Sequence, residues 1–299
     1  MAMSSRRFIY SKRYFADLEG HVFPIEKYKL LHEKLIKNNL ASEKDFLEPE
    51  MPSHEDLLLV HTKEYLEDLY KLKSSHRTIY SELPLTKEIV DLFILSAGGT
   101  ILAARIALEE KISLHIGGGW HHAFPDKAEG FCYINDVAIA IKKLKKENII
   151  KKPAVIDCDL HQGNGTAFTF KDDKDVFTFS IHQENLYPTK QKSSLDIGLD
   201  DFADDNEYLS NLEYALNIIF DKFKPDFVFY LAGADPYEDD QLGLLKISMD
   251  GLKKRDELVF SKCKKIRIPV AVTLAGGYAR NTEDTVNIHY NTCKSVVEY

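Results

Sequence analysis

The sequence predicts an α/β fold: a single-domain, doubly wound, mostly parallel sheet with helices on both faces. The first observation is that short apolar runs alternate with amphipathic stretches along the 299 residues, as is typical of parallel sheets. The second is that a polar loop follows each of five apolar runs. The third is that no repeat, low-complexity tract or flexible linker divides the chain, so we expect residues 1–299 to form one domain.

The apolar runs predict five buried strands, because they are short and rich in Val, Ile and Phe. They cover residues 112–116, 154–157, 176–181, 226–231 and 270–274. The amphipathic stretches between them predict helices over residues 135–146, 207–223 and 249–262. Further helices are expected near the start of the chain, over residues 26–38, 53–71 and 90–110.

The composition indicates a globular protein with a cytoplasmic location. Hydrophobic residues make up 44% of the chain and charged residues 29%, which is an ordinary balance for a folded protein. The formal net charge of −8 argues against binding nucleic acid by bulk charge and suits a cationic substrate better. The four cysteines form no CxxC pair, which favours reduced thiols in the cytosol.

No segment is expected to anchor the protein in a membrane. The most apolar stretch, residues 92–104, is short for a bilayer span and contains the pair Gly98 and Gly99. Residues 1–15 are basic but have no apolar run behind them, so we expect no signal peptide. The sequence carries no pattern that indicates an oligomeric state.

The loops that follow the expected strands contain the residues with chemical potential. In chain order they read GGGWHH, DLHQGNG, HQENLYP, GADPYEDD and AGGYAR. Ligand sites in open α/β sheets lie outside the carboxyl ends of the strands. We therefore expect the five loops to form one site at that edge of the sheet.

The loop after the second strand has the pattern of a metal site. Alternate side chains of an extended chain point the same way, so Asp159 and His161 can reach one ion together. Asp235, at the end of another strand, is the best candidate for a third ligand. These ligands suit Zn²⁺, with Fe²⁺ or Co²⁺ as substitutes, and three of them leave a coordination position open for catalysis. Each residue alone would more often be a helix cap or a surface group.

His121 and His122 are candidates for acid–base catalysis beside that metal. Each imidazole needs a partner that fixes its tautomer, and the metal loop offers Asp157 and Asn164. Asp157 would stabilise a charged imidazolium, whereas Asn164 would accept the Nδ1–H without adding charge. We therefore expect the histidine next to Asn164 to stay neutral more readily and to act as the base.

Tyr278 is a candidate donor to a developing oxyanion. It follows the fifth expected strand and the pair Gly276 and Gly277. A phenol O–H in this place could donate from the side opposite to the metal. Without the neighbouring loops, a half-buried aromatic residue at a turn would be the simpler interpretation.

Four long motifs occur in a fixed order: GGGWHHAFPDKAEGFCYINDVAIAI, VIDCDLHQGNG, YLAGADPYEDDQLG and TLAGGYAR. They resemble the zinc-dependent histone deacetylases of the arginase/deacetylase superfamily, and among these the class IV branch. The resemblance covers most of the chain, from GHVFP near Gly20 to AGGYAR at Ala275. It implies an enzyme that hydrolyses the amide of acyl-lysine side chains in proteins or peptides.

The resemblance also implies zinc ligands, a histidine dyad with two partners, and a catalytic tyrosine. In that order the matching residues are Asp159, His161 and Asp235; His121 and His122; Asp157 and Asn164; and Tyr278. In the family, the second histidine of the dyad is usually taken as the general base and acid. Class IV members carry Asn at the position of Asn164, where many other members carry Asp.

A substrate channel and a second ion are further implications of the resemblance. Gly130, through its backbone, and Phe131 match channel residues, and Tyr187 matches the opposite wall. Asp157 and Ser180 match a site for a monovalent cation, K⁺ or Na⁺, near the zinc. The class IV resemblance suggests long-chain fatty acyl groups as well as acetyl as substrates.

Three alternative functions are considered. A binuclear manganese ureohydrolase would need an acidic residue at Gly163, so one metal is favoured. An acetylpolyamine hydrolase would suit the acidic charge, but Leu242 stands where some polyamine-acting members carry Glu. The nearby Glu238, Asp239 and Asp240 fit a solvated turn equally well. A scaffold that binds acyl-lysine or a protein without turnover would not require the complete catalytic set.

Overall fold

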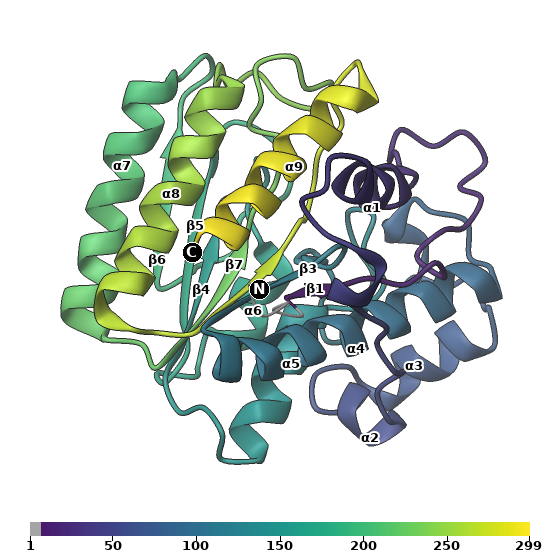
Figure 1. The fold of residues 1–299 in the computed structure, drawn as a ribbon. Helices are drawn as coiled ribbons and strands as arrows, with labels where there is room; N and C mark the ends of the chain where they lie inside the picture. The colour runs from purple at the N-terminus through teal and green to yellow at the C-terminus, as the bar shows by residue number, and fades with distance from the viewer. Residues whose placement is uncertain (1–6) are drawn as a thin grey trace.

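Figure 1 shows a computed structural model of the chain, which describes residues 7–299. Within these residues eight strands form one sheet in the order β2-β1-β3-β8-β7-β4-β5-β6. All neighbouring strands are parallel. The predicted fold class is confirmed, and the sheet is parallel throughout. Residues 1–6 lie outside the described residues, and with them part of the stretch in which no signal peptide is expected.

Helices and strands alternate through most of the chain. The strands are β1 (Phe8–Ile9), β2 (Phe46–Leu47), β3 (Ile112–His115), β4 (Pro153–Asp157), β5 (Phe177–Gln183), β6 (Leu195–Leu199), β7 (Phe227–Leu231) and β8 (Val270–Thr273). The helices are α1 (Lys27–Lys37), α2 (His54–Leu57), α3 (Lys63–Tyr70), α4 (Lys87–Glu110), α5 (Asp136–Lys146), α6 (Asn164–Phe170), α7 (Asp205–Ile218), α8 (Met249–Ile266) and α9 (Thr282–Glu298). Two 3₁₀ turns, η1 (Glu43–Asp45) and η2 (Ile79–Ser81), and a π-turn, η3 (Ile219–Phe223), complete them.

The five predicted strands are β3, β4, β5, β7 and β8, with ends that differ by at most two residues. Sequence periodicity does not find β1 and β2, because each is only two residues long. It also does not find β6, an edge strand in which half-buried and exposed residues alternate and which contains Gly198. Buried, continuous apolar runs are therefore the strands that the sequence makes visible.

The helix predicted over residues 53–71 is wrong, because the structure has two short helices, α2 and α3, in this range. Thr62 has an extended backbone, and its side chain caps α3 by accepting a hydrogen bond from Tyr65 N. The preceding His61 is buried, and its Nδ1 lies 3.1 Å from the carbonyl of Phe124. Tertiary contacts of His61 and the cap at Thr62 thus interrupt a segment that is helical by pattern alone.

Helices cover both faces of the sheet. In Figure 1, α7, α8 and α9 lie side by side over one face, whereas α4 and α5 lie on the other. Residues 92–104, the apolar stretch that was judged too short for a bilayer span, lie within α4. The whole helix is longer, and by length and composition alone it could cross a membrane. However, 78% of its most apolar window is buried against the rest of the protein. In this structure α4 is therefore a core helix.

The parallel sheet brings the polar loops together. The loops that follow β3, β4, β7 and β8 leave from the same edge, because all four strands run in one direction. The backbone links them further: Ala275 N donates to Gly118 O, and Ala234 N donates to Gly276 O, both at 3.1 Å. The carboxyl edge of the sheet is thus one connected surface, as expected for a ligand site in this architecture.

Candidate active site

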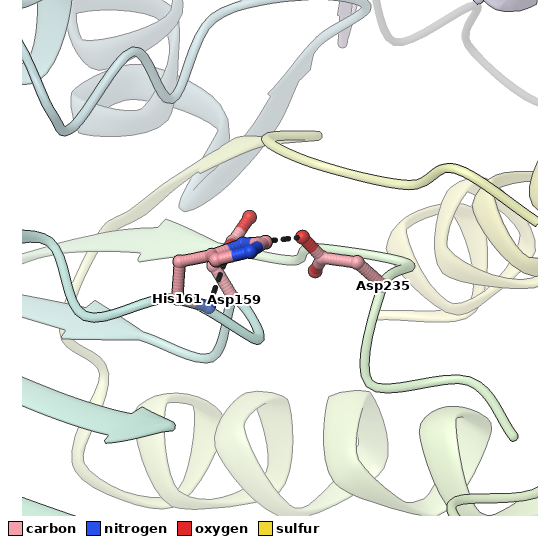
Figure 2. Close-up of side chains that lie close together, drawn as sticks. All are labelled: Asp159, His161 and Asp235. Carbon is pink, nitrogen blue, oxygen red and sulfur yellow. Dashed lines mark hydrogen bonds and ion pairs between the residues drawn. The ribbon is translucent and has the colours of Figure 1, made fainter. Parts of the chain in front are cut away.

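Three side chains from two strand ends form a cluster that could hold a metal ion. Asp159 and His161 follow β4, and Asp235 follows β7 (Figure 2). All three are buried, and their ligand atoms lie within 4.8 Å of one another. Nδ1 of His161 lies 3.3 Å from Asp159 Oδ1 and 3.4 Å from Asp235 Oδ2. The structure therefore brings together the three residues predicted as metal ligands.

Backbone donors hold the two carboxylates in place. Gly276 N donates to Asp159 Oδ2 at 2.8 Å, and Leu160 N donates to Asp235 Oδ1 at 3.0 Å. A Cβ atom at Gly276 would overlap Asp235 Oδ2. Glycine is therefore required here for the close approach of the backbone to the carboxylates.

The cluster fits a divalent cation. Asp235 Oδ2 is buried and accepts no hydrogen bond of good geometry, and its nearest polar neighbour is His161 Nδ1 at 3.4 Å. Burial and the neighbouring charge of Asp159 raise the pKa of Asp235 to about 6. A cation on these atoms would compensate both the missing partner and the repulsion between the carboxylates. Two carboxylates and one imidazole form a donor set that suits Zn²⁺.

The two adjacent histidines have the different partners that the sequence predicts. Nδ1 of His121 donates to Asp157 Oδ2 at 2.7 Å, whereas Nδ1 of His122 donates to Asn164 Oδ1 at 2.8 Å. The two Nε2 atoms lie 3.1 Å apart. All four residues are buried. The dyad is thus held at both ends, by a charged partner on one side and a neutral partner on the other.

These environments shift the pKa values of the two imidazoles in opposite directions. Burial disfavours the charge on His121, but the carboxylates of Asp157 and Asp159 outweigh it and raise the pKa of His121 to about 9. Burial and the charge of His121 lower the pKa of His122 well below 6.5. These shifts favour the charged form of His121 and the neutral form of His122, and the contact with Asn164 Oδ1 favours the proton of His122 on Nδ1.

Tyr278 lies beside the cluster with its hydroxyl protonated. Burial and the charges of Asp235 and Asp159 raise its pKa well above 10. Its ring contacts Phe131 edge to face, with 5.9 Å between the ring centroids. The phenol can therefore act as a hydrogen-bond donor, as the sequence predicts, but not as a base.

A pocket of about 270 Å³ leads to this group. Its lining consists of Glu82, His122, Gly130, Phe131, His161, Leu186, Tyr187, Leu242 and Tyr278. Gly130, Phe131 and Tyr187, the residues predicted for a channel, are thus part of this lining. Phe131 contacts Tyr278, and the ring of Tyr187 lies 5.5 Å from that of His122.

The two residues predicted for a monovalent cation are neighbours in the sheet. Asp157 of β4 is paired with Ser180 of β5. Ser180 Oγ lies 2.9 Å from His182 Nδ1, and Asp157 Oδ2 accepts from His121. The pairing puts Asp157 between the dyad and Ser180.

The interpretation of residues 238–240 as a solvated turn is wrong for Asp240, which is buried. Its carboxylate accepts hydrogen bonds from Tyr278 N at 2.7 Å and from Leu242 N at 2.9 Å. Asp240 therefore fixes the backbone of Tyr278. The run of three acidic residues concealed it, because such runs are usually solvated.

Other buried charges that support the site were also missed. Asp136 accepts from Gly119 N and Trp120 N, at 3.0 and 2.8 Å, and so holds the backbone before the dyad. Arg255 donates to Cys158 O and Gly233 O, at 3.3 and 2.5 Å, and thus ties the two metal-ligand loops together.

Lys27 is a third buried charge of this kind. Its Nζ donates to Ala275 O at 2.8 Å and lies 5.9 Å from the centre of the Tyr278 ring. Asp136, Arg255 and Lys27 all lie in helices that read as ordinary amphipathic segments. No local signal in the sequence distinguishes them.

Comparisons with known proteins agree with this geometry. The family model described as "Histone deacetylase domain" matches residues 21–293. An uncharacterised protein of Picosynechococcus is 40% identical over 91% of this chain and 91% of its own length. "Histone deacetylase 2" of Arabidopsis thaliana is 31% identical over 94% of this chain and 76% of its own length. "Acetoin utilization protein AcuC" of Bacillus subtilis is 31% identical over 81% of this chain and 69% of its own length.

The solved structure of an HDAC homolog from Aquifex aeolicus has the same fold. Its TM-score is 0.84, and the alignment covers 98% of this chain and 84% of that chain at 24% identity. At this identity the likeness shows the fold, whereas the family rests on the domain match and on the relatives above. The chain belongs to the histone deacetylase family and is a hydrolase that acts on amides.

Proposed function

We propose that residues 1–299 form one catalytic domain, a zinc-dependent deacetylase that removes acetyl groups from lysine side chains of proteins or peptides. One observation carries the proposal: the metal-ligand cluster lies next to a neutral His122 and a protonated Tyr278 at the end of one pocket. Asn164 as the partner of His122 supports placing the chain near class IV of the family.

The residues that hold the metal would be Asp159, His161 and Asp235. A bound Zn²⁺ would supply a Lewis acid for the amide carbonyl and an activated water. The same donor set would accept Fe²⁺ or Co²⁺. Gly163 supports a single ion, because a Cβ at this position would overlap Asp157 Oδ2. An acidic side chain for a second metal therefore has no space there.

In the proposed reaction His122 accepts a proton from the attacking water, because it is neutral and His121 is already charged. His121, paired with Asp157, stays protonated and keeps a positive charge beside the reacting group. Tyr278 donates its O–H to the oxyanion that forms on the carbonyl. His122 then transfers its proton to the leaving amine, and the products are acetate and lysine.

The cavities favour a slender substrate with a short acyl group. The pocket of about 270 Å³ is at the small end for ligand sites, which measure roughly 300–1,000 Å³, and it suits a single side chain. A second cavity, between Trp120 and Gly276 and lined also by His121 and Tyr278, measures only about 20 Å³. That is space for about one water molecule. We therefore propose acetyl rather than a long fatty chain as the preferred group.

A polyamine is a second candidate substrate because of Glu82, the acidic residue in the pocket lining. Its carboxylate would attract a distal ammonium group. Against this, Leu242 lines the same pocket and places an apolar side chain where a cation would have to be bound.

The four cysteines, all buried and free in the described residues, support the proposed cytoplasmic location.

The test is hydrolysis of lysine peptides that carry acetyl, octanoyl or myristoyl groups, with N-acetylputrescine alongside. We expect zinc-loaded protein to prefer the acetyl peptide and to lose turnover on chelation, and Zn²⁺ to restore it. His122→Ala should keep the zinc and lose about 10²–10⁴-fold in kcat. Turnover of the polyamine alone would overturn the substrate, and no turnover of any compound would favour a binding-only protein.

A further inference from the structure

The side-chain amide of Asn164 lies between His122 and Glu129. One of them bonds to its oxygen and the other to its NH₂ group. Its Oδ1 accepts from His122 Nδ1 at 2.8 Å, and its Nδ2 donates to Glu129 Oε1 at 2.7 Å. Asn164 is buried, and the side chain of Glu129 is 14% exposed. Both contacts are therefore largely shielded from water.

Two groups hold the orientation of this amide: Gly165 N donates to its Oδ1 at 3.0 Å, and Glu129 accepts from its Nδ2, which makes Glu129 the only side chain that holds its NH₂ end in the described residues. An ionised carboxylate only accepts hydrogen bonds, so the NH₂ group must face Glu129 and the carbonyl oxygen must face His122. The oxygen in turn requires a proton on His122 Nδ1, which leaves Nε2 unprotonated. If the amide were turned around, its NH₂ group would donate to Nδ1, and the proton of His122 would move to Nε2. That tautomer cannot accept a proton at Nε2.

The carboxylate is itself fixed on both sides. Glu129 exchanges two backbone hydrogen bonds with Cys132, at 3.0 and 3.2 Å. Its second oxygen forms an ion pair with Lys127. The Lys127 ammonium also lies 4.4 Å from the centre of the Phe124 ring. The chain of contacts thus runs from Lys127 through Glu129 and Asn164 to His122.

We propose that Glu129 is a positioning residue that sets the tautomer of His122 through the Asn164 amide. The proposal rests on the proposed function, in which His122 is the base. It also explains why an asparagine can serve here: an aspartate has no NH₂ group, needs no orientation, and would face Glu129 as a second negative charge. The effect of replacing Glu129 should therefore depend on which residue stands at position 164.

The experiment compares four zinc-loaded full-length proteins: wild type, Glu129→Leu, Asn164→Asp and the double variant. With Asn164 present, Glu129→Leu should lower kcat about 10–100-fold and leave the zinc content unchanged, whereas a rise in KM would report its interaction with Tyr187 at the pocket mouth. In the Asn164→Asp background the same change should leave kcat equal or raise it, because it removes a repulsion. An equal loss in both backgrounds would show a merely structural role and overturn the proposal.

Two additions make the result independent of folding and of substrate. Glu129→Gln keeps the shape of the side chain and should give a smaller loss with the same dependence on residue 164. Glu147→Gln, a control at an ion-paired glutamate of the surface, should leave kcat unchanged. ¹⁵N NMR of the His122 ring, assigned with His122→Ala, should show the Nδ1–H tautomer in wild type and a mixture in Glu129→Leu.

The two proposals fail in different ways. If wild type hydrolyses none of the acyl substrates, the proposed function fails, whereas the NMR comparison still tests Glu129. If wild type is active and Glu129→Leu matches it in both kcat and ring tautomer, the role of Glu129 is refuted while the proposed function stands.

Discussion

The floor and the mouth of the pocket are built in different ways. The floor consists of the metal-ligand cluster and the dyad, which are buried and follow strand ends, and backbone donors such as Gly276 N hold the carboxylates of the cluster. The mouth consists of loop residues such as Glu82 and Tyr187, of which Tyr187 is 44% exposed. The comparison teaches that the groups with chemical potential lie where the sheet ends, whereas the entrance to them is built from loop residues that are partly exposed.

The largest effect is expected at the floor, for Tyr278→Phe. Removing the hydroxyl takes away one donor to the oxyanion, so kcat should fall about 100-fold or more while KM changes little. Steady-state kinetics on the acetyl-lysine peptide measures this. Tyr290→Phe on α9 removes a phenol away from the pocket and should keep the wild-type rate. A Tyr278→Phe variant with near wild-type kcat would exclude the oxyanion role.

The sequence predicts the floor well because its residues obey a local rule. Asp159 and His161 come directly after a strand that is a continuous apolar run, which places them at the carboxyl edge of the sheet, although residues 159–161 form bends and not the extended segment that was expected. The buried polar residues that support the floor, here called the frame, follow no such rule. Asp136 and Asp240 bind backbone groups that are distant in sequence, and only the folded chain shows these contacts.

The start of the chain is less predictable for the same reason. His61 and Thr62 interrupt an apparent helix because of contacts with residues around 125, and β1 and β2 are too short for any periodicity. The mouth was located only through family resemblance, since single loop residues such as Tyr187 carry no pattern of their own.

A medium effect is expected in the frame, which contains neutral buried histidines. His61 Nε2 accepts from Asn135 N, and His115 is linked through Thr100 to Asp136. Burial lowers the pKa of His61 to about 4 and that of His115 to about 3. Between these values and 6.5 the unfolded chain binds more protons than the folded one, so the free energy of unfolding falls as the pH falls.

Each of these histidines should cost up to about 1.4 kcal/mol per pH unit within that window. Urea unfolding from pH 7 to pH 4.5 measures the slope. His61→Gln keeps an acceptor for Asn135 N but cannot be protonated. The slope of its unfolding free energy against pH should therefore be smaller, by the uptake of about one proton. An unchanged slope would show that His61 does not contribute to the acid sensitivity of the frame.

The smallest effect is expected at the mouth, for Tyr187→Ala. Because the ring is half exposed, its loss should cost about 1 kcal/mol of substrate contact and raise KM about fivefold, with kcat nearly unchanged. Kinetics on the acetyl and octanoyl peptides measures KM and any change in their ratio. Tyr214→Ala, which removes an exposed ring of α7 outside the pocket lining, is the matched control. A kcat loss as large as that of Tyr278→Phe would contradict the separation of floor and mouth. The mouth would then take part in the chemistry through the contact of Tyr187 with His122.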